Sequence, residues 1–389
     1  MALTGGLFLT LLAVALVVAT GAAIFYKPRW GPILARTAQR AFLVVLAQAL
    51  AILVAAVAVN NWGSFYGSWN DLFGGGTTLT TATAAGGASW NAATPKKGSA
   101  KNPKAGRPTG LSPTSWSTPN QYATKGQVGS VEIKGVKSKL NADALVYLPP
   151  QYFQPKYANT NFPVVEVFTG YPGYVKQLIR NIRYPDALLT AMGKGTAKPM
   201  IMVFFNPALV PPRDTECTNV PHGPQVATYF MQDVPAMIEA NLRTTTSGWG
   251  LMGHSTGGYC ATKMAMMAPK MFNTVVSLSG NYQATRDYNT GSLWGGSQSL
   301  RNLNDPEWRL RHLPIPPIAV LASVGSLERG SDGLTDTRRF IGLVRPPMQS
   351  QLIVVQGGAH NFADYRRVLP QAFAWLSAHL SPSTATPAA

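Results

Sequence analysis

The chain has 389 residues, of which 46% are hydrophobic and 13% are charged, and its formal net charge is +17. This length fits one large domain with added segments, or two domains, and the hydrophobic share is sufficient for a substantial core. A strongly basic chain can bind nucleic acid. Here the basic residues are scattered and no zinc-finger, RNA-recognition or helix-turn-helix pattern occurs, so we expect no nucleic-acid partner.

Two apolar runs without a charged residue, Leu7–Tyr26 and Ala41–Val59, lie near the N-terminus. Each has about the 20 residues that cross the hydrocarbon core of a bilayer. The loop between them, 27–40, holds four Lys and Arg residues, and positive charge in a short loop indicates the cytoplasmic side. We therefore predict that residues 1–73 form a transmembrane hairpin with both ends outside the cytoplasm. A cleaved signal peptide is disfavoured because the start, MALTGG, lacks a basic segment.

Residues 74–125 are rich in Gly, Ser, Thr, Ala and Pro and carry several Lys residues. Such a segment has too little apolar surface to offset the entropy of ordering, so we predict a flexible basic linker. From about residue 126 the sequence pattern changes to short apolar runs alternating with amphipathic stretches, and a catalytic domain is predicted over 126–381. The tail, 382–389, is predicted to be disordered.

Short apolar runs alternate with amphipathic stretches throughout 126–381. The runs expected to form strands are 144–148, 164–168, 200–205, 248–252, 274–278, 318–322 and 352–355. The stretches expected to form helices are 171–192, 225–242, 258–268 and 362–380. This alternation predicts a mainly parallel sheet covered by helices on both faces.

A G-x-S-x-G motif, Gly253-His254-Ser255-Thr256-Gly257, joins one of these strands to the helix that follows. The pattern alone is weak in a glycine-rich chain, and a turn serine is the alternative. A nucleophile elbow, however, requires this strand–turn–helix setting, with small residues that let strand and helix pack closely. We predict Ser255 as the nucleophile.

A serine nucleophile needs a base, and in this kind of site the chain order is serine, acid, histidine. Three histidines follow the motif. His360 comes just after the last predicted strand, where a loop can place its ring over the strand ends. His312 precedes the strand that should carry the acid, and His379 lies within the C-terminal helix. We predict His360 as the base.

The acid should follow the strand at 318–322. Glu328 lies three residues after Gly325 in a short loop, and Asp332 lies farther along it. Either could be an ordinary solvated carboxylate. We predict that Glu328 orients the imidazole and stabilises the imidazolium, with Asp332 as the alternative acid.

The oxyanion of a tetrahedral intermediate should meet two backbone N–H groups. One is expected from Thr256, the residue after the nucleophile. The other is expected from the turn at 169–173, and because Pro172 has no N–H, we predict Tyr171. The alternative is an ordinary Gly/Pro turn.

The chain has two cysteines, Cys217 and Cys260, and both are expected near the strand ends where the site should form. An extracytoplasmic chain would tend to pair them, so we predict a disulfide, with two separate buried thiols as the alternative. The segment 281–317 contains two Trp residues and fits either a cap over the site or surface packing.

Several segments together resemble the esterase D family, which includes the antigen 85 mycolyltransferases and many actinobacterial secreted esterases. They are LVYLPPQYF, PVVEVFTGYPG, GWGLMGHSTGGYCATKMAMMAPKMFNTVVSLSGNY, ASVGSLE and GGAHNF. The resemblance covers about 126–380 and implies an α/β-hydrolase fold, a Ser255–Glu328–His360 triad and acyl-ester chemistry without metal or organic cofactor. Many relatives have His-Gly where this chain has Thr169-Gly170, which removes any role for that side chain.

The sequence thus predicts a membrane-anchored extracytoplasmic serine esterase, with an acyl ester as substrate and an envelope lipid as one candidate. One alternative is an acyltransferase that moves the acyl chain to a sugar or lipid hydroxyl. Another is a non-catalytic envelope binding or assembly protein on a hydrolase scaffold, because fold does not fix function. No protein partner is indicated.

Overall fold

The computed structural model describes residues 6–26, 32–63, 110–286, 289–328, 333–382 and 384–385. By backbone contacts the chain divides into two units, one of Met1–Thr78 with Asn361–Ala363 and one of the remaining residues.

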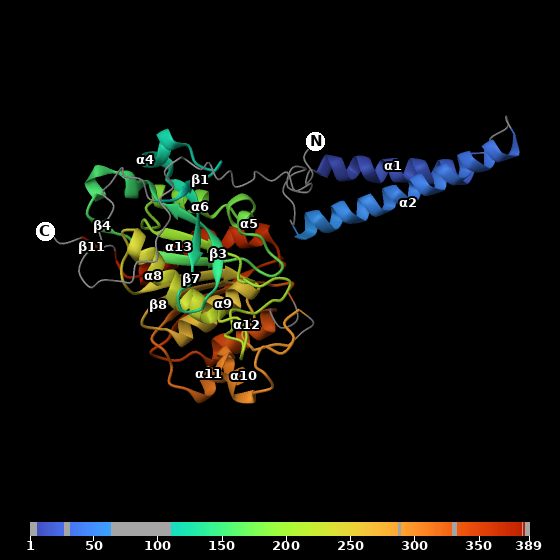
Figure 1. The fold of residues 1–389 in the computed structure, drawn as a ribbon. Coiled ribbons are helices and arrows are strands. Elements are labelled where there is room, and N and C mark those ends of the chain that lie inside the picture. The colour runs from blue at the N-terminus through green and yellow to red at the C-terminus, as the bar shows by residue number, and fades with distance from the viewer. Residues whose placement is uncertain are drawn as a thin grey trace. The chain divides into compact units, whose positions relative to one another are not determined.

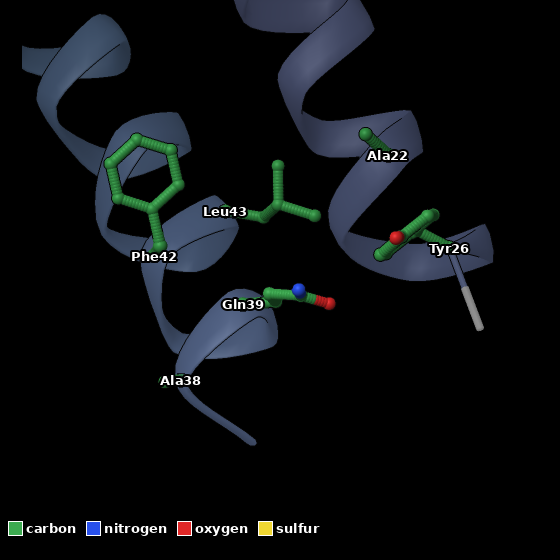
Figure 2. Close-up of a pocket in the computed structure, with 6 residues that line it drawn as sticks. All are labelled: Ala22, Tyr26, Ala38, Gln39, Phe42 and Leu43. Atoms are coloured by element: carbon green, nitrogen blue, oxygen red, sulfur yellow. The ribbon is translucent and has the colours of Figure 1, made fainter. Parts of the chain in front are cut away.

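The N-terminal unit contains two apolar helices, α1 (Gly6–Phe25) and α2 (Ile33–Gly63), which lie side by side (Figure 1). Both are long and apolar enough to cross a membrane. A pocket of about 490 Å³ lies between them, and Figure 2 shows its lining residues, Ala22, Tyr26, Ala38, Gln39, Phe42 and Leu43. The predicted helices are confirmed. Residues 33–40, predicted as loop, instead begin α2, because Ala, Leu, Arg and Gln there favour a helix.

The larger unit is built on a nine-stranded sheet in the order β1-β2-β3-β6-β5-β7-β8-β9-β10. Its strands are β1 (Ser112–Pro113), β2 (Gln127–Lys134), β3 (Asn141–Leu148), β5 (Val164–Phe168), β6 (Ile201–Phe205), β7 (Trp249–His254), β8 (Phe272–Leu278), β9 (Ala319–Gly325) and β10 (Gln349–Val355). Six neighbouring strands, β6, β5, β7, β8, β9 and β10 in sheet order, run parallel to one another. At one edge, β1, β2 and β3 pair antiparallel, and β3 is also antiparallel to β6.

Helices cover both faces of this sheet (Figure 1). The main ones are α5 (Val175–Arg180), α6 (Tyr184–Gly193), α8 (Val234–Asn241), α9 (Thr256–Met267), α10 (Gln298–Leu303), α11 (Pro306–His312), α12 (Leu334–Leu343) and α13 (Phe362–His379). Strands β5 and β6 are buried at every position, as expected for parallel strands covered on both sides. The predicted α/β-hydrolase fold is confirmed.

Two predicted helices differ in detail from those in the structure. The stretch 171–192 forms α5 and α6 as separate helices, because the chain turns at Arg183, whose φ is 64°. The stretch 225–242 contains α7 (Val226–Thr228), a π-helical turn, η4 (Tyr229–Asp233), and α8.

The folded unit begins earlier than the predicted boundary at 126. Within 110–125, β1 pairs with β2, the Thr114 hydroxyl donates to the carbonyl oxygen of Val128, and Leu111 is buried. The linker prediction is therefore wrong for these residues, because a few contacts with β2 order a stretch of low apolar content. In the predicted tail, Thr384–Ala385 forms β11, which pairs with β4 (Thr160–Asn161). Residues 74–109 and 386–389 lie outside the described residues.

Candidate active site

The candidate site lies where the carboxyl ends of four neighbouring parallel strands meet. Phe168 at the end of β5 is level with Gly253 of β7, and Leu278 at the end of β8 is level with His254 of β7 and Ser323 of β9. Because chains leave parallel strands at the same edge, the loops after these strands converge there. This register explains why residues far apart in sequence come together.

Ser255 occupies the sharp turn between β7 and α9. Its φ and ψ are 54° and −128°, a left-handed backbone that a non-glycine residue rarely adopts. A Cβ added at Gly253 would lie 2.4 Å from the carbonyl oxygen of Gly257, and one at Gly257 would lie 2.4 Å from that of Thr169. Both motif glycines are therefore required for strand and helix to cross so closely, which is the geometry of a nucleophile elbow.

The structure brings Glu328 and His360 together. His360 Nδ1 lies 2.7 Å from Glu328 Oε2, and the carboxylate is almost fully buried while the ring is about one-third exposed. A carboxylate only accepts, so Nδ1 carries the proton and Nε2 presents a lone pair. This is the tautomer that a general base needs. The alternative acid, Asp332, lies outside the described residues.

The two other histidines after the motif contact residues of their own helices. Nδ1 of His312 lies 2.9 Å from the carbonyl oxygen of Trp308, and Nδ1 of His379 lies 2.9 Å from that of Trp375. The His312 ring also stacks on Trp308, and the His379 ring lies against Trp375 at an interplanar angle of 36°. Both rings therefore interact with residues of their own helices, α11 and α13.

The loop after β5 lies against the elbow. A Cβ added at Gly170 would lie 3.0 Å from Ser255 Cβ, and the Gly170 N–H donates to His254 Nε2 at 2.9 Å. Among the described residues, the backbone N–H groups of Tyr171 and Thr256 have no protein acceptor. These are the two predicted oxyanion donors. Their role stays a prediction, and their availability is what an oxyanion hole requires.

His254 fixes this loop and is kept neutral. It is almost fully buried, and burial lowers its pKa to about 3, with a smaller contribution from the charge of His360. Since Nε2 accepts from Gly170, the neutral tautomer is required for the loop to stay in place. The sequence motif does not reveal this role, because the residue before the serine varies freely in G-x-S-x-G.

Acid should therefore destabilise the fold through His254. In the unfolded chain this imidazole binds a proton below about pH 6.5, whereas in the folded chain it stays neutral to about pH 3. Between these values the unfolded state binds more protons, so stability present above pH 6.5 is lost as the pH falls, by up to about 1.4 kcal/mol per pH unit. Denaturant unfolding at pH 7, 5.5 and 4.5 measures it. The loss should be shallower in His254→Gln, and equal slopes would contradict the prediction.

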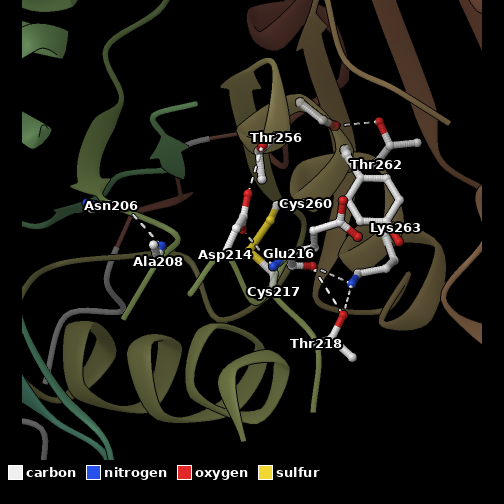
Figure 3. Close-up of a disulfide and its surroundings, with 12 residues drawn as sticks. Asn206, Ala208, Asp214, Glu216, Cys217, Thr218, Thr256, Cys260, Thr262 and Lys263 are labelled. Atoms are coloured by element: carbon white, nitrogen blue, oxygen red, sulfur yellow. Dashed lines mark hydrogen bonds between the residues drawn. A yellow bond between two sulfur atoms is a disulfide. The ribbon is translucent and has the colours of Figure 1, made fainter. Parts of the chain in front are cut away.

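The predicted disulfide between Cys217 and Cys260 is present (Figure 3). It joins the loop after β6 to α9, the helix that begins next to the nucleophile. In the same loop, Asp214 Oδ2 accepts a hydrogen bond of 3.2 Å from the hydroxyl of Thr256. The loop is thus attached both to the elbow helix and to one predicted oxyanion donor.

A buried lysine on α9 forms hydrogen bonds to this loop. Lys263 Nζ donates to the carbonyl oxygen of Glu216 at 2.5 Å and to the hydroxyl of Thr218 at 2.8 Å. Burial lowers the pKa of Lys263, and the nearby carboxylates of Glu216 and Asp214 oppose that shift. This cluster cannot be predicted from the sequence, because its residues have no recognisable spacing.

The segment 281–317 packs on the same loop. Arg213 donates to the carbonyl oxygens of Thr290 and Ser292 at 2.9 and 2.7 Å. Trp294 is buried in a small apolar cluster with Val220. The segment is therefore held at the edge of the sheet where Ser255 lies.

No group of three or more metal-ligating side chains occurs in the part of the chain that the structure describes.

A family model described as a putative esterase matches residues 138–376. An uncharacterized protein of Corynebacterium glutamicum is 24% identical over 252 residues, which are 60% of this chain and 57% of that protein. The chain thus spans little more than half the length of this curated relative.

Solved structures share the fold at low identity. An S-formylglutathione hydrolase from Agrobacterium tumefaciens superposes with a TM-score of 0.55 at 14% identity, over 66% of this chain and 96% of that one. The fluorophosphonate-binding serine hydrolase F of Staphylococcus aureus superposes with a TM-score of 0.51 at 15% identity, over 65% of this chain and 98% of that one. These likenesses show the architecture.

Proposed function

This chain belongs to the putative esterase family, and on that premise we propose that it hydrolyses carboxylic esters through an acyl-enzyme formed on Ser255. The membership confirms the resemblance drawn from the sequence motifs. The observation that carries the proposal is the buried Glu328 carboxylate 2.7 Å from His360 Nδ1, at the same sheet edge as a serine in a left-handed turn. A structural serine needs neither feature.

These positions support the following reaction. Ser255 Oγ attacks the ester carbonyl carbon while His360 Nε2 takes its proton, and Glu328 stabilises the imidazolium. The backbone N–H groups of Tyr171 and Thr256 bind the oxyanion. His360 then returns the proton to the leaving alcohol, and the acyl-enzyme forms. Water, deprotonated by His360, attacks the acyl carbon and releases the acid and the free serine.

A membrane anchor and an extracytoplasmic catalytic domain are part of this proposal. Two helices long enough to cross a membrane support the anchor. The Cys217–Cys260 disulfide supports an oxidising compartment, since disulfides are rare in the cytosol. The loop 27–40, including the start of α2, would then face the cytoplasm, and envelope lipid esters would be within reach.

A fluorophosphonate probe tests the nucleophile. In the full chain we expect one adduct, on Ser255, in the washed membrane fraction, and both Ser255→Ala and His360→Ala should abolish or strongly reduce it. Ser299→Ala, which changes an exposed serine on α10, should label like the unmodified chain. Mass spectrometry of the digested protein locates the adduct. A folded chain that fails to label would favour the non-catalytic alternative, and a labelled chain in the soluble fraction would contradict the anchor.

The acceptor is tested on the same preparation with short- and long-chain p-nitrophenyl esters. We expect turnover with water alone. Turnover that requires an added sugar or lipid alcohol, with the acyl group recovered on that alcohol, would instead show an acyltransferase, because both reactions share the acyl-enzyme.

A further inference from the structure

Ser279 is a residue that neither the motif nor the family match singles out. It follows β8 directly and is almost fully buried. Its φ is 51°, which places a non-glycine residue in the left-handed region. Glycine adopts this backbone without cost, whereas a side chain there costs roughly 1 kcal/mol. A strained, buried serine beside a candidate site calls for a physical reason.

The Ser279 hydroxyl points at the acid of the proposed triad. Its Oγ donates to Glu328 Oε1 at 2.7 Å, and the Gly325 N–H donates to the same oxygen at 2.6 Å. The other oxygen, Oε2, lies 2.7 Å from His360 Nδ1. One carboxylate oxygen is thus held by two donors, which leaves the second directed at the imidazole.

The backbone of Ser279 is itself fixed. Its N–H donates to the carbonyl oxygen of Ser323 on β9 at 2.7 Å. The hydroxyl therefore reaches Glu328 from a position set by the sheet rather than by a flexible loop. The left-handed turn aims the Cβ of Ser279 toward the loop that carries the acid, and a glycine there would keep the turn but lose the donor.

We propose that Ser279 is a positioning residue that holds the Glu328 carboxylate in the orientation required to support His360. The proposal rests on the proposed serine esterase function. Hydrogen bonds to a charged acceptor are stronger than those between neutral groups, and a carboxylate that rotates away no longer stabilises the imidazolium. The effect of Ser279 on the reaction therefore passes entirely through Glu328.

The decisive variant is Ser279→Gly, in the full chain. Glycine suits the observed φ, and relief of that strain offsets part of the cost of the lost hydrogen bond, so the thermal unfolding midpoint should fall only slightly. We nevertheless expect kcat to fall about ten- to a hundredfold, as for loss of a hydrogen bond to a charged group, with KM little changed. The acid limb of the pH profile of kcat/KM should move to lower pH, because the imidazolium loses support. A purely structural role would change stability and leave the pH profile in place.

Two comparisons sharpen the test. Ser277→Ala removes another buried hydroxyl, on β8, which accepts from Tyr282 at 3.1 Å and makes no described bond to Glu328. It should leave the pH profile unchanged. In a Glu328→Gln background, Ser279→Gly should have almost no further effect on kcat, because coupled residues are not additive.

Among the described residues, titratable groups near His360 and Glu328 include His254, Tyr282, Tyr365 and Asp364, and none is altered in these variants. The proposal would be overturned if Ser279→Gly kept the wild-type kcat. It would also be overturned if Ser279→Gly lowered kcat by the same factor in the Glu328→Gln background as in the unmodified chain. If the unmodified chain does not label at Ser255, the esterase proposal itself fails. Normal labelling with unchanged Ser279→Gly kinetics would reject only the role of Ser279.

Discussion

Replacing His360 by alanine is expected to lower kcat on a p-nitrophenyl ester by about 10⁴- to 10⁶-fold, the loss typical of removing a triad base. Without the imidazole nothing takes the proton of Ser255, and a hydroxyl is a poor nucleophile at neutral pH. KM should change little, because the ring contributes mainly in the transition state. Steady-state kinetics on purified full chain measures it.

The matched control is His312→Ala. That histidine is exposed on α11, where it stacks on Trp308. It should keep kcat within about twofold of the unmodified value, as is usual for surface substitutions. A His360→Ala chain that retains a tenth of the activity would show that another group is the base.

Glu328→Gln removes the negative charge of the acid that contacts His360 while keeping the shape of its side chain. An amide can donate to Nδ1 as well as accept from it, so the ring can adopt the tautomer whose Nε2 is already protonated. A loss in kcat of up to about 10⁴-fold is expected, as for the wrong tautomer in other triads. The contact at 2.7 Å between Oε2 and Nδ1 is the reason for expecting so large an effect from one atom.

The fold could be predicted because its signals are local. Each parallel strand is a short apolar run that ends in a turn, and β5 and β6 read as continuous hydrophobic segments since both faces are buried. The helices α1 and α2 were equally visible from length and hydropathy. The elbow was recognisable because its glycines and serine are adjacent in sequence.

The supporting contacts of the site are not local. Gly170 meets His254 across 84 positions, and Ser279 meets Glu328 across 49. Such pairs depend on strand order and register, which a single sequence does not specify. A hydroxyl or amide has no characteristic spacing that would identify its role. The predicted triad came from chain order, whereas the residues that hold it in place required the structure.

The boundary errors have the opposite cause. Strands β1 and β11 have two residues each, too short for any alternation of apolar and polar side chains. They are ordered by pairing with β2 and β4, so the information lies in the partner strand. The start of α2 lies outside the apolar run that predicts the helix, because its first turns, about two in number, include Arg36 and Arg40.

Removing the disulfide, as Cys217→Ala with Cys260→Ala, is expected to give the largest loss of stability. The two cysteines are 43 positions apart, and the chain-entropy relation gives about 4 kcal/mol for closing a loop of that length. For a domain of this size that corresponds to a fall of roughly 8 to 16 °C in the thermal unfolding midpoint. Circular dichroism of the purified full chain measures it, with the unmodified chain in strong reductant as a second sample.

The same double variant should also reduce activity below the unfolding temperature. Without the bond, the loop after β6 keeps its polar contacts and the packing of Val220 against Trp294. Glu216 and Cys217, however, both have left-handed backbones, with φ of 46° and 50°. Relaxation of these residues would move Asp214 away from Thr256 and release one proposed oxyanion donor. A modest loss in kcat with retained Ser255 labelling is expected. An unchanged midpoint would mean that Lys263 and the packed segment 281–317 hold the loop by themselves.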